Sequence, residues 1–452
     1  MVDYLSSELK GFLNILKKYP TQIPRYTSYP TAPLFGKLDS ETYYKSLASC
    51  DLDKDISIYI HIPFCRKLCW FCGCNTKITN HYPPVHKYLK LLIKEIELFN
   101  KQVGKKVKVS HVHFGGGSPT ILEPDDFSKL MSIIRENFTL TLDAQIALEV
   151  DPRSVNEAKI ASYSKAGVNR VSLGIQDFSH DVQVAINRIQ PFSLVYKTVE
   201  LFRSYNISQI NFDLIYGLPQ QTTKNIVKNI ELSLTMKPNR LALFGYAYVP
   251  WKKKNMLLID PKILPNEDLR FALYNIAAKT ITDNGYISVG IDHFALPEDN
   301  MIVARNNHQL KRNFQGYTVD ESNNLVGFGV SSITSLDNGY FQNVTNNVDY
   351  HKFIKTGNLP IAKGILLSEE DKLRGKIIEE IMCYLTCDIS RIILPNIYEI
   401  HSNLKLLEKD QLISFNNEII IINPKIPQVA RIVCSLFDAY YEQENESKHS
   451  KV

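Results

Sequence analysis

The chain has 452 residues, which at roughly 100 to 200 residues per domain predicts two to four structural units with a large core. Its 44% hydrophobic and 22% charged residues, with 20 Gly and 21 Pro, exclude collagen-like, coiled-coil and wholly disordered chains. A net charge of +5 favours an anionic substrate only weakly, and we expect no nucleic-acid partner.

The N-terminal residues do not have the pattern of a secretory signal. Residues 1–18 carry Asp3 and Glu8 inside an apolar pattern, without a continuous apolar stretch before a cleavage site. The most apolar uncharged run, 241–251, is too short for a membrane span, which needs about 20 residues. We therefore expect a cytoplasmic protein with reduced thiols and no membrane span.

Residues 1–54 are expected to form an arm and a helix that cover the site, with an extended stretch at 22–32. From residue 55 onward, short β-rich runs alternate with helical ones. Strands are predicted at 56–62, 109–114, 145–150, 170–175, 207–215 and 241–248, with helices at 85–99, 127–134, up to Gly167, 193–205 and 222–236 between them. Six βα units imply parallel strands with right-handed crossovers, either an open doubly wound sheet or a whole or partial barrel.

The rest of the chain has a different pattern. A helix is predicted at 265–284 and a strand at 286–293, and a loop-rich stretch runs to about residue 359. A helix at 368–382 and a strand pair around 412–422 indicate a separate small C-terminal domain. The expected organisation is an arm at 1–54, a barrel with its loop-rich extension at 55–360, a C-terminal domain at 361–440 and a disordered tail at 441–452.

Four cysteines lie within ten residues directly after the first predicted strand. Cys65, Cys69 and Cys72 have the spacing C-x3-C-x2-C, and Cys74 follows. Thiolates this close in a reducing compartment are typical ligands of a soft metal or an iron–sulfur cluster. A structural zinc site is the alternative, but no second Cys or His pair with zinc spacing follows. Three ligands on a four-iron cluster would leave one iron open.

Several motifs together resemble the oxygen-independent coproporphyrinogen III oxidase family of radical S-adenosylmethionine (SAM) enzymes. They occur in order along the chain: the stretch from His61 to Cys74, HFGGGSPT at 113–120, EVDPR at 149–153, GIQDF at 174–178, NFDLIYGLP at 211–219, DHFA at 292–295 and RNFQGY at 312–317. The resemblance implies a partial (β/α)6 TIM-type barrel of the radical SAM class, with an N-terminal arm and a small, mainly helical C-terminal domain.

The resemblance also implies the cofactors. Cys65, Cys69 and Cys72 would ligate a [4Fe-4S] cluster whose open iron chelates SAM. An electron from the cluster would then cleave SAM to methionine and a 5′-deoxyadenosyl radical. Cys74 cannot be a fourth ligand in this scheme, because it would block the open iron, and its role is not explained.

The family's binding of two SAM molecules carries over to two sets of positions. One set is Tyr59, Gly116, Glu149 and Ile333, and the other is Phe71, Gly117, Ser118, Gln176, Arg188, Asp213 and Ala247. An arginine such as Arg188 suits a methionine carboxylate, and Asp213 or Glu149 suits ribose hydroxyls. Catalytic roles would fall on Tyr59, Glu149, Phe314, Gln315 and Ile333, the last three matching positions near the second molecule.

The implied reaction converts two propionates of coproporphyrinogen III to vinyl groups, giving protoporphyrinogen IX in haem biosynthesis. Each propionate would lose a hydrogen atom, carbon dioxide and one electron, which needs no protein acid or base. The implied partners are this substrate and a reductase or flavodoxin/ferredoxin electron donor, with a monomeric enzyme. A haem chaperone and a haem-opening radical methyltransferase are the alternatives, but the chaperones typically lack counterparts of Cys74 and of the arm at 25–30.

Overall fold

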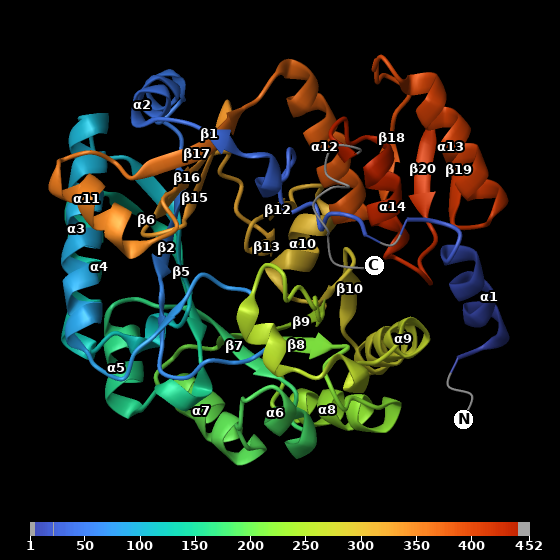
Figure 1. The fold of residues 1–452 in the computed structure, drawn as a ribbon, viewed down its shortest axis with the longest axis horizontal. Coiled ribbons are helices and arrows are strands. Elements are labelled where there is room, and N and C mark those ends of the chain that lie inside the picture. Colours follow the sequence, from blue (N-terminus) through green and yellow to red (C-terminus); the bar gives the residue numbers. More distant parts are fainter. Residues whose placement is uncertain (1–4, 21, 442–452) are drawn as a thin grey trace.

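The structure is a computed structural model that describes residues 5–20 and 22–441. Six parallel strands form its centre, and they neighbour one another in chain order (Figure 1). They are β2 (Ile56–Ile62), β5 (Lys108–Gly116), β6 (Thr139–Val150), β7 (Arg170–Gln176), β8 (Gln209–Tyr216) and β9 (Arg240–Gly245). This arrangement confirms the predicted partial barrel.

Of the tail expected at 441–452, the structure describes only residue 441, so that prediction lies outside the described residues. The helices between the parallel strands lie along the outer side of the curved sheet (Figure 1). They are α3 (Pro83–Val103), α4 (Pro124–Asn137), α5 (Glu157–Lys165), α6 (His180–Ala185), α7 (Phe192–Ser204) and α8 (Thr223–Thr235), followed after β9 by α9 (Glu267–Asp283).

Local sequence explains where these helices begin and end. Helix α3 has proline at its first positions, where a missing N–H costs nothing, and it ends at Gly104 in the left-handed conformation. Helix α8 begins with a capping box, in which Thr222 and Asn225 each bond the other's backbone N–H. Local sequence therefore fixes the end of α3 and the beginning of α8.

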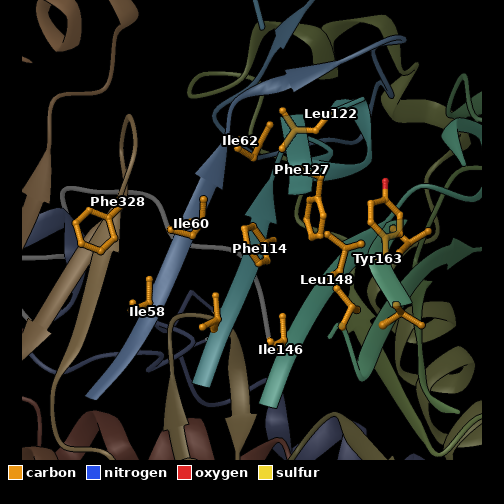
Figure 2. Close-up of a cluster of buried hydrophobic side chains, with 14 of the residues drawn as sticks. Ile58, Ile60, Ile62, Phe114, Leu122, Phe127, Ile146, Leu148, Tyr163 and Phe328 are labelled. Carbon is orange, nitrogen blue, oxygen red and sulfur yellow. The ribbon is translucent and has the colours of Figure 1, made fainter. Parts of the chain in front are cut away.

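The hydrophobic core lies between the strands and the outer helices. Side chains alternate along β2, so that Ile58, Ile60 and Ile62 face the helices with Phe114 of β5 (Figure 2). Phe114 packs on Phe127 of α4, with ring centroids 5.2 Å apart. The opposite face of each strand is left for the barrel interior, where the polar residues of the motifs gather.

Both edges of the barrel sheet are extended. Strand β14 (Leu325–Phe328) pairs in parallel with β2, and β15 (Ile333–Leu336), β16 (Gly339–Asn343), β17 (Ile361–Leu366) and β1 (Gly36–Lys37) follow it antiparallel. At the other edge, β11 (His293–Ala295) and β10 (Ile287–Val289) form a hairpin on β9.

These edges differ from two sequence expectations. The stretch to residue 359, predicted as loop-rich, contains β14 to β16, the hairpin of β12 (Lys311–Asn313) and β13 (Gly316–Thr318), and the helices α10 (Asn300–Asn306) and α11 (Asn347–Lys355). Strands of three to five residues are too short to show the alternation of apolar and polar residues that predicts a strand. The single strand predicted at 286–293 is interrupted because Gly290 adopts a positive φ of 56° between β10 and β11.

The C-terminal elements share a second core with the beginning of the chain. This core joins α12 (Glu369–Tyr384), β18 (Thr386–Asp388), α13 (Ile397–Lys409), β19 (Ile413–Asn416), β20 (Ile419–Ile422) and α14 (Val429–Leu436) to α1 (Ser7–Leu16). The remaining helix, α2 (Ser40–Ser49), packs on the barrel core through Tyr43 and Leu47. Among the described helices, none is long and apolar enough to cross a membrane.

The extended arm at 22–32 is held from two sides. The Tyr26 hydroxyl donates to Asp438 at 3.1 Å, and the Tyr29 hydroxyl accepts from the Ala439 N–H at 3.0 Å. On the barrel side, Arg25 Nη2 donates to the Gly245 carbonyl at 2.7 Å, just where β9 ends. The arm therefore links the C-terminal elements to the carboxyl end of the barrel.

Candidate functional site

The thiol loop, residues 63–76, follows the carboxyl end of β2. Cys65 is fixed by the short parallel pairing of β3 (Phe64–Cys65) with β4 (Lys77–Ile78). Cys65, Cys69, Cys72 and Cys74 all line one cavity of about 380 Å³, which also reaches the inner faces of the parallel strands. The sequence motif thus lies where parallel barrels build their active sites.

Hydrogen-bond donors surround the thiols. Thr76 Oγ1 donates to Cys65 Sγ at 3.2 Å, and the guanidinium groups of Arg153 and Arg188 each approach Cys69 Sγ at 3.4 Å. Positive neighbours favour the thiolate form, which is the form that binds metals. Among the described residues, no three His, Cys, Asp or Glu side chains converge on a point that would hold a single metal ion. The fit to an iron–sulfur cluster rests on the shared cavity and on these donors.

Cys74 lies beside Cys72. A hydrogen bond from the Cys74 thiol lowers the pKa of Cys72 to about 6. The backbone carbonyl of Cys74 accepts from Lys253 Nζ at 2.9 Å. Cys74 therefore has contacts on both its side chain and its backbone, which the spacing of the motif does not reveal.

Three glycines end β5, and the protein's own packing requires all of them. A Cβ at Gly115 would lie 2.6 Å from Glu149 Oε1, and one at Gly116 would lie 2.7 Å from the His61 ring. At Gly117 it would lie 2.8 Å from the Phe64 carbonyl oxygen. Gly116 and Gly117 were predicted as SAM positions, and the structure adds this internal reason for glycine there.

Two carboxylates, Glu149 of β6 and Asp213 of β8, face the cavity. Glu149 accepts from the Gly116 N–H and from His113 Nε2, each at 3.1 Å. Burial and the Glu149 charge raise the pKa of Asp213 to about 6, although the Ser172 hydroxyl lies 3.0 Å from both of its oxygens. Acceptors of this kind suit the hydroxyl groups of a bound ligand.

Arg188 belongs to a buried charged group beside the thiols. Its Nη2 donates to the Gly174 carbonyl at 2.8 Å and lies 3.5 Å from Asp151 Oδ1. Burial alone would raise the pKa of Asp151, but Arg188 and Arg153 lower it to about 2. Within the described part of the chain, Arg188 Nε is buried without a hydrogen-bond partner. An unsatisfied buried guanidinium N–H at the cavity wall fits an anionic ligand group.

Gln176 ends β7 in a conformation that few residues adopt. Its φ is +65°, where a residue other than glycine is strained, and the pairing of β7 with β8 shifts between Gly174 and Gln176. The side chain lines the cavity. Gln190 supports this bend by donating to the carbonyls of Gly174 and Ile175, at 3.0 and 2.7 Å.

Most of the predicted site residues share the cavity, but four do not line it. Those on the cavity wall are Cys65, Cys69, Phe71, Cys72, Gly116, Gly117, Ser118, Glu149, Gln176, Arg188, Asp213 and Gln315. Tyr59 stacks on His113 with centroids 5.8 Å apart, and Phe314 packs edge-on against Tyr340 at 5.8 Å. Ile333 lies in β15, and Ala247 follows β9.

The sequence analysis missed several polar residues of the cavity. Asp151 and Arg153 belong to the EVDPR motif, from which only Glu149 was assigned a role. Arg170 and Arg240 also line the cavity. Charged residues that begin two of the parallel strands, β7 and β9, were a usable signal, because such residues are costly in a core.

The comparisons with known proteins agree on one family. A sequence profile described as the radical SAM superfamily matches residues 59–232. An "Oxygen-independent coproporphyrinogen III oxidase" from Cereibacter sphaeroides is 43% identical over 380 residues, which cover 84% of this chain and 84% of the relative. A protein of the same name from Bradyrhizobium diazoefficiens is 40% identical over 428 residues, 93% of this chain and 95% of that one.

A solved structure gives the same result. The coproporphyrinogen III oxidase of Escherichia coli, described as a radical SAM enzyme, superposes with a TM-score of 0.86 at 33% identity. The match covers 94% of this chain and 98% of that chain. The similarity therefore extends over the barrel, its edges and the C-terminal elements together.

Proposed function

The chain belongs to the oxygen-independent coproporphyrinogen III oxidase family of radical SAM enzymes, and we infer from this membership that it makes protoporphyrinogen IX from coproporphyrinogen III. It is an oxidoreductase of haem biosynthesis that uses a [4Fe-4S] cluster and SAM. The observation that carries this conclusion is the relationship to named oxidases over nearly the whole chain, with the three motif cysteines on one cavity.

Cys65, Cys69 and Cys72 would hold the cluster. When bound, the cluster and SAM supply the one-electron chemistry that removes a hydrogen atom from each reacting propionate. Loss of carbon dioxide and one further electron then leaves a vinyl group, so no side chain has to act as acid or base. The protein's own contribution is to bind and orient the substrate and the cofactors and to exclude water.

The polar cavity residues have roles in this proposal as binding groups. Arg188 Nε, which is buried and has no partner among the described residues, suits the methionine carboxylate. Glu149 and Asp213 suit ribose hydroxyls, and Gln176 is aimed at the same space by its unusual backbone. Two SAM molecules, with Phe314, Gln315 and Ile333 near the second, remain part of the proposal.

The three regions of the chain divide the work in this proposal. Residues 1–54 cover the site, 55–360 carry the chemistry and 361–440 anchor the arm. An electron-donating reductase or a flavodoxin/ferredoxin would supply the electron, and the enzyme would act as a cytoplasmic monomer. Size-exclusion chromatography with light scattering tests the monomer directly.

Anaerobic turnover of the reconstituted protein tests the function. Coproporphyrinogen III, SAM, a reductant and an electron acceptor are supplied, and protoporphyrin and 5′-deoxyadenosine are measured together. Formation of both supports the oxidase, and a Cys69→Ala variant should form neither. Deoxyadenosine without protoporphyrin would contradict it and direct attention to haem binding or haem turnover, the two alternative functions.

A further inference from the structure

Two segments next to the cavity carry only positive charge. Residues 61–82 and 248–259 contain six Lys or Arg and neither Asp nor Glu, whereas the whole chain has 52 basic and 47 acidic residues. The six are Arg66, Lys67, Lys77, Lys252, Lys253 and Lys254. The first segment contains the thiol loop, so the charge is concentrated around the cysteines.

The second segment packs directly on the thiol loop. Lys253 Nζ donates to the Cys74 carbonyl at 2.9 Å. Asn255 Nδ2 donates to the carbonyls of Trp70 and Cys72, each at 3.0 Å. These bonds, made by Lys253 and Asn255, hold the segment against the thiol loop.

The charged side chains next to these bonds face solvent. Lys67, Lys252 and Lys254 are exposed. Among the described residues, no carboxylate lies within 4.0 Å of their amino groups. Their positive charge is therefore not paired within the described part of the chain and is available to an approaching partner.

Exposed apolar side chains lie among these lysines. Trp251 is 53% exposed, Leu257 is 65% exposed and Leu258 is 56% exposed. Their neighbours Met256 and Ile259 are buried with Val182 and Ile186, and Trp70 packs against the same cluster. The exposed apolar residues are thus fixed next to the thiol loop by a packed layer beneath them.

We define the thiol-loop face by its exposed members Lys67, Trp251, Lys252, Lys254, Leu257 and Leu258. An apolar centre with a charged rim is the composition of a protein interface. We propose that the thiol-loop face is the docking site of a small acidic electron-carrier protein of the flavodoxin class. At this face the reduced carrier would give one electron to the cluster that the thiol loop holds, and it would leave in its one-electron-oxidised form.

The position of the face favours this occupant over an anionic membrane. A membrane would need the lysines and apolar groups but not the cysteines. Here Lys253 and Asn255, which lie in the same segment as five of the six face residues, donate to carbonyls of the thiol loop, those of Cys74 and Cys72 among them. The inference rests on the proposed function, because radical chemistry is what gives the thiol loop a need for electrons.

Binding of a purified bacterial flavodoxin to the full-length, cluster-reconstituted protein tests the proposal. Calorimetry under anaerobic conditions should give a dissociation constant that rises with salt, as expected for complementary charges. The double variant Lys252→Glu/Lys254→Glu should bind about tenfold more weakly at low salt. The control Lys405→Glu/Lys409→Glu, on α13, changes the net charge equally and should bind like the wild type.

Turnover separates this proposal from the proposed function. Dithionite reduces the protein without docking, so dithionite-driven formation of 5′-deoxyadenosine tests the radical chemistry alone. The double variant should lose flavodoxin-driven product while keeping dithionite-driven product. Wild-type protein inactive with dithionite would refute the proposed function, whereas the binding constants judge the docking site independently.

Three binding results would overturn the docking site. The first is an equal dissociation constant for the wild type and the double variant, and the second is an equal loss of binding in the α13 control. The third is binding of the face to vesicles of anionic phospholipid, lost in the double variant, with no measurable binding of flavodoxin. A neutral variant, Lys252→Gln/Lys254→Gln, should bind flavodoxin with a dissociation constant between those of the wild type and the Lys252→Glu/Lys254→Glu variant.

Discussion

Replacement of Arg188 by glutamine tests the assignment of the cavity wall to SAM. The side chain offers a buried Nε without a partner among the described residues, and its Nη1 lies 3.4 Å from Cys69 Sγ. A hydrogen bond to a charged group contributes about 1.5 to 3 kcal/mol. The dissociation constant of SAM should therefore rise roughly 10- to 150-fold in Arg188→Gln. Arg188→Lys keeps the positive charge but not the planar guanidinium group. Its dissociation constant for SAM should lie between those of the wild type and Arg188→Gln.

The fold should tolerate this change. The Gly174 carbonyl keeps the bond from Gln190 Nε2 at 3.0 Å, and Asp151 keeps Arg153 at 2.7 Å. Equilibrium binding of SAM to the reconstituted protein measures the effect, and iron content confirms that the cluster is present. Arg203→Gln is the control, because Arg203 bonds backbone carbonyls away from the cavity. Normal iron content with a dissociation constant within about twofold of the wild type would refute the reasoning.

Other changes test the thiols, the glycines and a buried acid. Cys69→Ala should lose its iron by elemental analysis yet keep the wild-type far-ultraviolet dichroism; retained iron would contradict its role as a ligand. Gly117→Ala should lose cluster content, because its Cβ would lie 2.8 Å from the Phe64 carbonyl, whereas Gly36→Ala has open space and should not. Burial raises the pKa of Asp177 from its ordinary value of 3.8 to about 6. The protonated carboxyl therefore stabilises the folded state fully at a pH below about 3.8, and this stabilisation is lost as the pH rises through 6. Urea unfolding should show that Asp177→Asn removes up to about 3 kcal/mol of this pH dependence; an unchanged slope would argue against the raised pKa.

The sequence predicted the parts of the fold that have a regular pattern. Five of the six parallel strands were placed within three residues of their true ends, because apolar runs and Gly or Pro residues bound them, whereas β6 begins six residues before its predicted start. The edge strands β14 to β16 escaped prediction, since each has only four or five residues. The pairing of β14 with β2 joins residues that are far apart in the sequence, and no local signal encodes it.

The candidate site, like the fold, could be predicted only in part. Cys65, Cys69 and Cys72 were visible from spacing alone, but the two guanidinium groups near Cys69 come from Arg153 and Arg188. These arginines are more than 80 residues away along the chain, so only the fold brings them to the thiol. Spacing can identify ligands, whereas the charges that tune them depend on tertiary structure.

The position of the arm depends on residues that are synthesised near the end of the chain. Its anchors at Arg431, Asp438 and Ala439 are among the last described residues of the chain. A ribosome delivers every strand of the barrel before these anchors exist. Until then Arg25 has a complete barrel to lie on but no C-terminal support. A nascent or C-terminally shortened chain would therefore lack the anchors that hold the arm against the end of β9.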